Sequence, residues 1–131
     1  LRPDRLFLTS PARGGLDYTF CWIDGHPGRD FGAARVDRRA FAIAPREFAN
    51  VIGHPRGRLK EVCVHDNQVL WQDDVVVHYT SDTDEGSSGA SVCNNSWQLV
   101  ALHHASRPSH VPGHRFLNEG VKLSAIAADL E

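Results

Sequence analysis

The segment Tyr79-Thr-Ser-Asp-Thr-Asp-Glu-Gly-Ser-Ser-Gly-Ala-Ser-Val-Cys93 places Ser88 between Gly86 and Gly89, in a tight turn that leads into an apolar run. Glycines let the backbone adopt conformations that other residues avoid, and they leave room for a group bound close to the main chain. Such a turn can hold a hydroxyl beside backbone N–H groups aimed at one point, as acyl transfer requires. A loop of serine and glycine is also a common surface turn, so this segment alone does not distinguish a catalytic loop from an ordinary turn.

The composition excludes several classes of function. The 131 residues carry a net charge of −2 with interspersed charges, so we expect no broad surface for nucleic acid or membrane lipid. No apolar stretch reaches the roughly 20 residues that span a bilayer, and no signal segment follows Leu1. The three cysteines lack metal-type spacing and lie in apolar runs. They therefore predict buried free thiols in a reducing compartment, and hence a cytoplasmic protein.

Short runs of β-branched and aromatic residues alternate with glycine, proline, asparagine and aspartate along most of the chain. This pattern predicts an all-β, antiparallel sandwich or barrel with one short C-terminal helix over 124–131, capped by Ser124. Asp66-Asn67 predicts a tight hairpin turn between its flanking runs, and the loop 106–113, with its two prolines, is expected to be mobile. The predicted strands cover residues 5–9, 16–23, 50–53, 59–65, 68–72, 75–79, 90–93, 98–104 and 120–123.

The Ser88 loop resembles the signature of trypsin-like (chymotrypsin-fold) serine peptidases, Gly-x-Ser-Gly-Gly/Ala/Ser-Pro, except that Ser91 stands in place of the proline. Asp82-Thr83 before the loop, and the spacing from Ser88 to His103, resemble the glutamyl endopeptidase branch and its intracellular relatives. The resemblance extends over most of residues 16–130. Its further segments are Leu16-Asp-Tyr-Thr-Phe-Cys-Trp-Ile23, Val51-Ile-Gly-His-Pro-Arg-Gly57, Trp97-Gln-Leu-Val-Ala-Leu-His-His-Ala105 and Asn118-Glu-Gly-Val-Lys-Leu-Ser-Ala-Ile126.

The resemblance implies a catalytic apparatus. It makes Ser88 the nucleophile, and it makes the N–H groups of Gly86 and Ser88 the oxyanion hole. Asp17 would orient a catalytic histidine and stabilise its imidazolium form. The implied reaction is hydrolysis of a peptide bond through an acyl-enzyme, with no metal ion and no organic cofactor.

The resemblance also implies how substrate is recognised. Thr83 and His103 would hold an acidic or amide side chain, so cleavage is expected after Glu, or after Asp or Gln. Asp82 and Glu85 lie close in sequence and argue against this preference, because their charges would attract Lys or Arg instead. The substrate backbone would pair as an extra strand with the backbone of His104, Ala105 and Ser106.

The family's chain order is His, Asp, Ser, yet the first histidine here is His26, which follows Asp17. A serine nucleophile needs a general base, so three explanations stay open. The histidine lies on an N-terminal segment outside these residues, the protein is a pseudo-protease kept as a peptide-binding or regulatory module, or His104 substitutes.

We expect the first explanation. Residues 1–47 would then end an N-terminal barrel and connect it to a C-terminal barrel with its helix over 48–131, and this chain alone would be inactive. The expected partners are a protein or peptide substrate, and the N-terminal half of the same protease or other domains of a larger protein.

Overall fold

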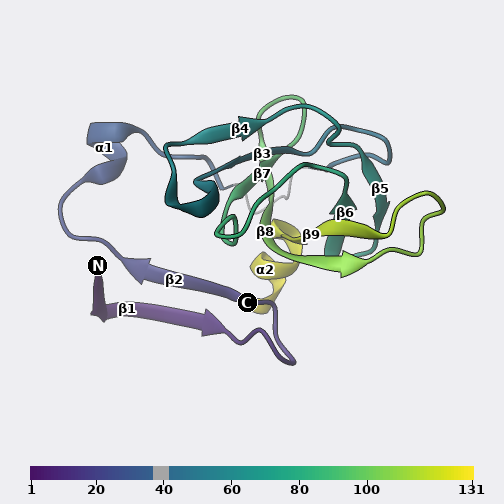
Figure 1. Cartoon of the computed structure of the whole chain (residues 1–131). Helices are drawn as coiled ribbons and strands as arrows, with labels where there is room; N and C mark the ends of the chain where they lie inside the picture. The colour runs from purple at the N-terminus through teal and green to yellow at the C-terminus, as the bar shows by residue number, and fades with distance from the viewer. Residues whose placement is uncertain (37–41) are drawn as a thin grey trace. The chain divides into compact units, whose positions relative to one another are not determined.

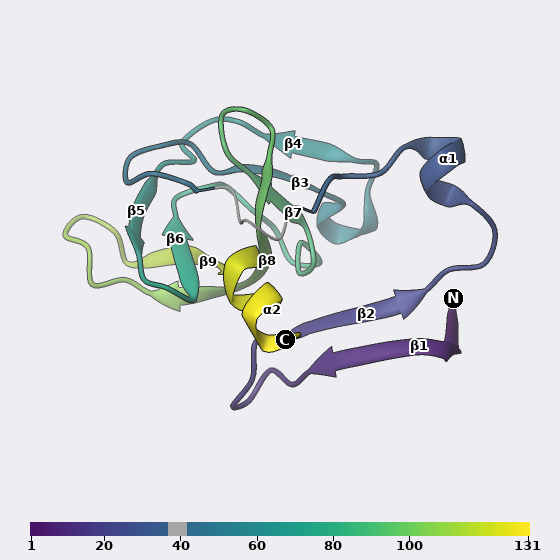
Figure 2. The same cartoon turned by 180° about the vertical axis from the view of Figure 1, so that it is seen from behind.

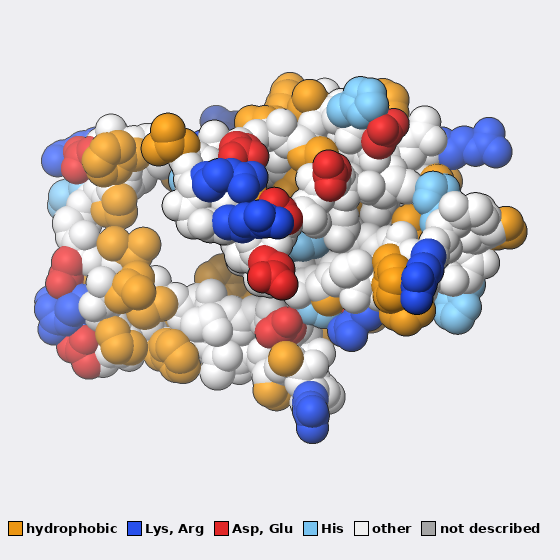
Figure 3. Space-filling model, in the orientation of Figure 1, with side chains coloured by type: hydrophobic (Ala, Val, Ile, Leu, Met, Phe, Trp, Pro, Cys, Tyr) orange, Lys and Arg blue, Asp and Glu red, His pale blue; other side chains and the backbone are white. Residues whose placement is uncertain are grey.

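The structure, a computed structural model, describes residues 1–36 and 42–131, and the chain divides into two units, Leu1–Arg35 and Val36–Glu131. The first unit contains strands β1 (Arg2–Ser10) and β2 (Tyr18–Trp22), which pair antiparallel, and a short helix α1 (Pro27–Phe31) (Figure 1). Hydrophobic side chains line this two-stranded ribbon (Figure 3). Several large ones are exposed, namely Leu6, Phe7, Leu8, Trp22 and Ile23.

Within the described part of the second unit, seven antiparallel strands form one sheet in the order β4-β3-β7-β8-β9-β6-β5. The β-branched and aromatic runs of the sequence form these strands, and their alternation sends one set of side chains inward. The helix α2 follows β9 directly, and it is the yellow element in the view from behind (Figure 2). The elements are β3 (Asn50–Gly53), a 3-10 turn η1 (Pro55–Gly57), β4 (Glu61–Cys63), β5 (Val69–Gln72), β6 (Val76–Tyr79), β7 (Ser91–Cys93), β8 (Leu99–Pro108), β9 (Phe116–Lys122) and α2 (Leu123–Asp129).

The segment before β3 closes this sheet against the segment before β5. Phe48 and Gln68 form an antiparallel bridge. The N–H of Ala49 donates to the carbonyl of Asn67 at 2.7 Å, and the N–H of Val69 donates to the carbonyl of Glu47 at 2.9 Å. The segment leading into β3 therefore pairs with the segment leading into β5, which closes the sheet as in a barrel. An all-β antiparallel fold with a short C-terminal helix is confirmed.

The inward side chains form the core of the second unit. They come from most of its strands, so the core ties together segments that are distant in sequence. Fully buried members such as Val69, Val77 and Val92 expose none of their surface. The rest of the cluster is Ile43, Ala49, Val51, Tyr79, Ala90, Val100 and Ala101, with Cys63 packed against it. All three cysteines are free thiols; Cys93 is buried, whereas Cys21 and Cys63 are half-buried.

The structure corrects three local predictions. Strands β4 and β5, which flank Asp66-Asn67, pair with β3 and β6 and not with each other, so these residues do not close a hairpin. Strand β8 continues to Pro108, so the first residues of the predicted 106–113 loop are paired with β9. Helix α2 begins at Leu123 and has no side-chain cap, which leaves Ser124 inside the helix.

Candidate active site

Ser88 lies in the loop that connects β6 to β7, and it is exposed. Gly86 and Gly89 have φ angles of 86° and 85°, in the left-handed region that glycine enters without strain. These two residues give the loop its sharp course around the serine. The Ser88 hydroxyl donates to the carbonyl of His104 on β8 at 3.5 Å, which is long for a hydrogen bond, so its proton is weakly held.

The backbone N–H groups of this loop fall into two sets. Those of Ser87, Gly89 and Ala90 donate to the carbonyls of Asp84, His103 and Ser87 at 3.2, 2.7 and 2.9 Å. The N–H groups of Gly86 and Ser88 have no acceptor among the described residues. The family resemblance implies these same two N–H groups as an oxyanion hole.

His103 and His104 point to opposite sides of β8, as strand alternation predicts. The ring of His103 is buried, and its Nδ1 lies 2.7 Å from the hydroxyl of Tyr79, which exposes none of its surface. Burial, and then the nearby charge of His104, lower the pKa of His103 to about 4, so the ring is neutral near pH 7. Burial also raises the pKa of Tyr79 above its ordinary value.

The tautomer of His103 follows from these contacts. Among the described residues, His103 is the one hydrogen-bond partner of the Tyr79 hydroxyl, so the phenol proton goes to Nδ1. In a neutral imidazole the other nitrogen then carries the proton. Nε2 of His103 is therefore a hydrogen-bond donor.

The ring of His104 is held on the other side of the sheet by Glu119 on β9. Nε2 of His104 and Nε2 of His78 lie 2.8 and 2.6 Å from the two carboxylate oxygens, and Arg107 donates to the same carboxylate at 2.9 Å. Burial opposes the charge of Glu119, but the hydrogen bonds from Arg107, His78 and His104 outweigh it and lower the pKa of the carboxyl. Sequence analysis did not identify Glu119 as a candidate site residue. The signal that could have identified it is a charged residue within the apolar last strand.

The pairing of β8 with β7 ends close to the Ser88 loop. Strand β7 pairs with β8 only as far as Leu102, and the N–H and carbonyl of His103 then bind Ala90 and Gly89. Beyond that point β8 pairs with β9 on its other side, after a bulge between His103 and Ala105. Among the described residues, the backbone of Ala105 and Ser106 has no strand partner on the side of the Ser88 loop.

Two clefts adjoin the loop. Thr83 lines one of them with Ser87, Cys63 and the carboxylates of Glu61, Asp66 and Asp82. No hydrogen bond joins Thr83 to His103 among the described residues, so the structure does not bring this predicted pair together directly. The other cleft is lined by Ser88 with His54, Lys60 and neighbouring residues of β3 and β7.

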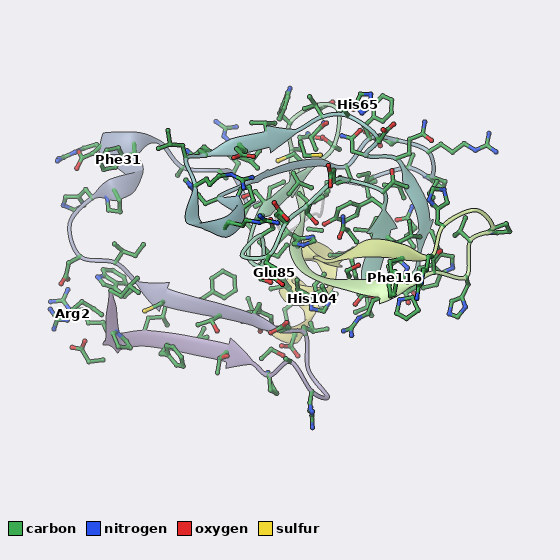
Figure 4. The ribbon with its side chains drawn as sticks, in the orientation of Figure 1. Arg2, Phe31, His65, Glu85, His104 and Phe116 are labelled. Atoms are coloured by element: carbon green, nitrogen blue, oxygen red, sulfur yellow. The ribbon has the colours of Figure 1, made fainter. Side chains whose placement is uncertain are left out.

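All eight histidines lie within the described residues, and none of their rings is hydrogen-bonded to the Ser88 hydroxyl. Figure 4 labels Glu85, which is in the Ser88 loop, and His104, which is on β8. The ring of His54 shares the second cleft, but its Nδ1 lies 3.0 Å from the carbonyl of Arg58, where it holds the bend after β3.

A family model of the trypsin-like peptidase domain matches residues 2–102. The chain belongs to the trypsin-like peptidase family. It is 31% identical over 171 aligned residues to uncharacterized protein y4fB of Sinorhizobium fredii, with all of this chain covered and 26% of the relative. The solved structure of a Glu endopeptidase in complex with MPD has a TM-score of 0.68 and 18% identity, covering 94% of this chain and 60% of that one. The chain thus spans about a quarter of the length of the Sinorhizobium fredii relative and about three-fifths of the Glu endopeptidase. The likeness to the Glu endopeptidase shows that the chain has the trypsin-like fold.

Asp17 of this trypsin-like chain lies in the first unit, in the turn just before β2. Its φ angle is 54°, and its N–H donates to the carbonyl of Pro11 at 3.4 Å. The strand predicted over 16–23 therefore starts only at Tyr18, and the carboxylate of Asp17 is on an exposed turn.

No group of three or more histidine, cysteine, aspartate or glutamate side chains in residues 1–36 and 42–131 is arranged to hold a metal ion. In the same part of the chain, no helix has both the length and the apolar character needed to cross a membrane.

Proposed function

We propose that this trypsin-like chain carries the nucleophile of a serine endopeptidase, and that Ser88 is that nucleophile. The observation that carries the proposal is the Ser88 hydroxyl, exposed and weakly bonded, beside the two open N–H groups of Gly86 and Ser88. Donors arranged in advance around a developing negative charge commonly make the largest single contribution to acyl transfer.

The proposed reaction runs in two stages. The oxygen of Ser88 attacks the carbonyl carbon of the scissile bond while its proton passes to a general base, and the carbonyl oxygen becomes an oxyanion held by the two N–H groups. The base returns the proton to the leaving amine, and the C–N bond breaks to give an acyl-enzyme. Water then attacks the ester with the same base, which releases the acid and restores Ser88.

The general base is proposed to be a histidine from a segment that is not among these 131 residues, with Asp17 as its orienting carboxylate. Three histidines of this chain are engaged elsewhere: His103 binds Tyr79, His104 binds Glu119 and His54 binds Arg58. The exposed apolar side chains of β1 and β2 support the same proposal. A ribbon of two strands is marginal by itself, and more strands would cover these side chains.

Substrate is proposed to add a strand along the backbone of 104–106, with the side chain before the scissile bond recognised by Thr83 and His103. The Nε2–H of His103 supports cleavage after Glu, Asp or Gln, because an N–H donor suits a carboxylate or amide oxygen. Asp82, which lines the cleft beside Thr83, favours the opposite preference, for Lys or Arg. A positional peptide library on the full-length protein separates the two, since a strong preference for Lys or Arg excludes the acidic one.

Fluorophosphonate labelling of the full-length protein tests the nucleophile. We expect labelling at Ser88 that Ser88→Ala abolishes and that Ser91→Ala, a change in the same cleft, leaves intact. The 131-residue chain alone should not label, because its base is missing; if it labels, the proposed origin of the base is wrong. Full-length protein that binds peptides yet never labels would instead be a pseudo-protease that acts as a binding or regulatory module.

The three free cysteines support a reducing, cytoplasmic location for this peptidase. Cell fractionation of the full-length protein tests this location, and recovery in an oxidising compartment would exclude it.

A further inference from the structure

The peptide bond between Glu85 and Gly86 is held from outside its own loop. The carbonyl of Glu85 accepts a hydrogen bond of 2.8 Å from the N–H of Arg56, which lies in η1 after β3. No described peptide bond is cis, and in a trans peptide the C=O and N–H groups point in opposite directions. Because Arg56 takes the carbonyl, the N–H of Gly86 points away from η1.

The orientation of this one peptide decides whether an oxyanion hole exists. If the peptide turned over, the carbonyl oxygen of Glu85 would replace the N–H of Gly86 at the edge of the Ser88 cleft. The site would then present an acceptor where the developing oxyanion needs a donor, and one of its two open N–H groups would be lost.

Two further contacts lock η1 to the loop. The guanidinium of Arg56 donates to the carboxylate of Asp84 at 2.9 Å, and the guanidinium of Arg58 lies 3.7 Å from the same carboxylate. Gly86 packs so closely on η1 that a Cβ atom there would lie 3.3 Å from the backbone nitrogen of Arg56. The contact is thus backbone against backbone, and it fits glycine.

Arg56 adopts an unusual backbone conformation to make this contact. Its φ angle is 51°, in the left-handed region, which β-branched residues strongly avoid. The position of its N–H depends on this conformation, so a substitution that disfavours it weakens the hold on Glu85. The Pro55-Arg56 pair gave no such signal in the sequence, because the contact joins segments from two different loops.

We propose that Arg56 is a positioning residue that keeps the N–H of Gly86 turned toward the oxyanion. The inference rests on the proposed function and adds to it a residue that does not touch substrate. It predicts that the backbone conformation at position 56, more than the arginine charge, controls the rate of the chemical step.

The test compares Arg56→Gly with Arg56→Val in the full-length protein. Both variants lose the guanidinium, but glycine keeps the left-handed conformation easily and valine opposes it. Arg46→Val is the matched control, because Arg46 also follows a proline, has a φ angle of 66°, and donates its N–H to the carbonyl of Val69, outside the Ser88 loop.

We expect Arg56→Gly and Arg46→Val to keep kcat within about threefold of the parent value. Arg56→Val should lower kcat by at least about tenfold with little change in KM, toward the roughly 10²–10³-fold loss seen when a whole donor is removed. A peptidyl trifluoromethyl ketone gives a second reading. Ser88 adds to its carbonyl to form a hemiketal, whose oxyanion pKa, followed by ¹⁹F NMR, should rise in Arg56→Val only.

The outcomes separate the two proposals. If the parent protein neither cleaves peptides nor forms the hemiketal, the peptidase proposal fails and the role of Arg56 falls with it. If the parent is active and Arg56→Val matches Arg46→Val in both kcat and hemiketal pKa, only the role of Arg56 is overturned. If Arg56→Val does not fold, hydrogen exchange of the Arg56 amide in the parent decides: slow exchange supports the contact with Glu85, and exchange at the rate of an open loop refutes it.

Discussion

The hydroxyl oxygen of Tyr79 lies 2.7 Å from Nδ1 of His103, and both side chains are buried. The phenol proton has no other acceptor among the described residues, so the pair fixes His103 as a neutral ring with its proton on Nε2. The pair therefore links the folding stability of the second unit to the protonation state of His103.

Stability should fall as the pH drops from about 6.5 to about 4, because the pKa of His103 is lowered from its ordinary 6.5 to about 4. In that window the unfolded chain binds a proton that the folded chain does not, so the stability present above pH 6.5 is lost progressively on acidification. The shift corresponds to roughly 3 kcal/mol at most. An NMR titration of His103 checks it directly, and a midpoint near 6.5 would contradict the prediction.

Tyr79→Phe should destabilise the chain by about 1–3 kcal/mol, because it leaves Nδ1 of a buried imidazole without a partner. Denaturant unfolding at neutral pH measures the loss. The ¹⁵N spectrum of His103 adds a second check: the parent should show a protonated Nε2 and a bare Nδ1, and the reverse assignment would refute the tautomer.

Gly86→Ala should cost more stability than Gly113→Ala. Both glycines have left-handed φ angles, of 86° and 87°, so both variants pay a similar conformational penalty of about 1 kcal/mol or more. A Cβ at Gly86 would also lie 3.3 Å from the Arg56 nitrogen, whereas one at Gly113 meets nothing within 4 Å. Thermal unfolding compares the two, and fluorophosphonate labelling of the full-length protein should fall only in Gly86→Ala. Equal stability and equal labelling would show that the close contact is unimportant.

The sequence predicted those parts of the fold that depend on neighbouring residues. Strand β3 has the predicted bounds, and the sharp turn around Ser88 follows from Gly86 and Gly89 on either side of it. Partners distant in sequence were not predictable from local pattern. Asp66-Asn67 looks like a hairpin turn, yet its flanking strands find partners elsewhere, and β8 runs on to Pro108 because β9 pairs with it.

The candidate site divides in the same way. Ser88 and the nearby N–H groups could be identified from the residues next to them in sequence. The contact of Arg56 with Glu85 and the three partners of Glu119 could not, because they depend on how remote segments pack. The short helix α1 also escaped prediction, because its five residues are too few for a periodic pattern.

Glu119→Gln should destabilise the chain by roughly 3 kcal/mol, because it weakens the charge-assisted hydrogen bonds of a buried carboxylate to His78, His104 and Arg107. Since the pKa of Glu119 is lowered, its contribution is present above pH 4.5 and is lost as the pH falls through the folded value. The variant should therefore also flatten the stability curve in acid. Glu61→Gln, on the exposed pair with Arg58, is the control and should unfold like the parent; equal unfolding of the two variants would count against a structural role for Glu119.

Phe7→Glu tests whether further strands cover β1 and β2 in the full-length protein. Phe7 is 55% exposed on a ribbon of two strands, and Phe116, at the start of β9, is a matched control at 54%. If partner strands that carry the catalytic histidine pack on the ribbon, a charge at Phe7 opposes that packing and should abolish labelling of Ser88 by fluorophosphonate. Phe116→Glu adds the same charge to the second unit and should leave labelling unchanged. Full labelling of Phe7→Glu would mean that the ribbon is not where the base-bearing segment docks.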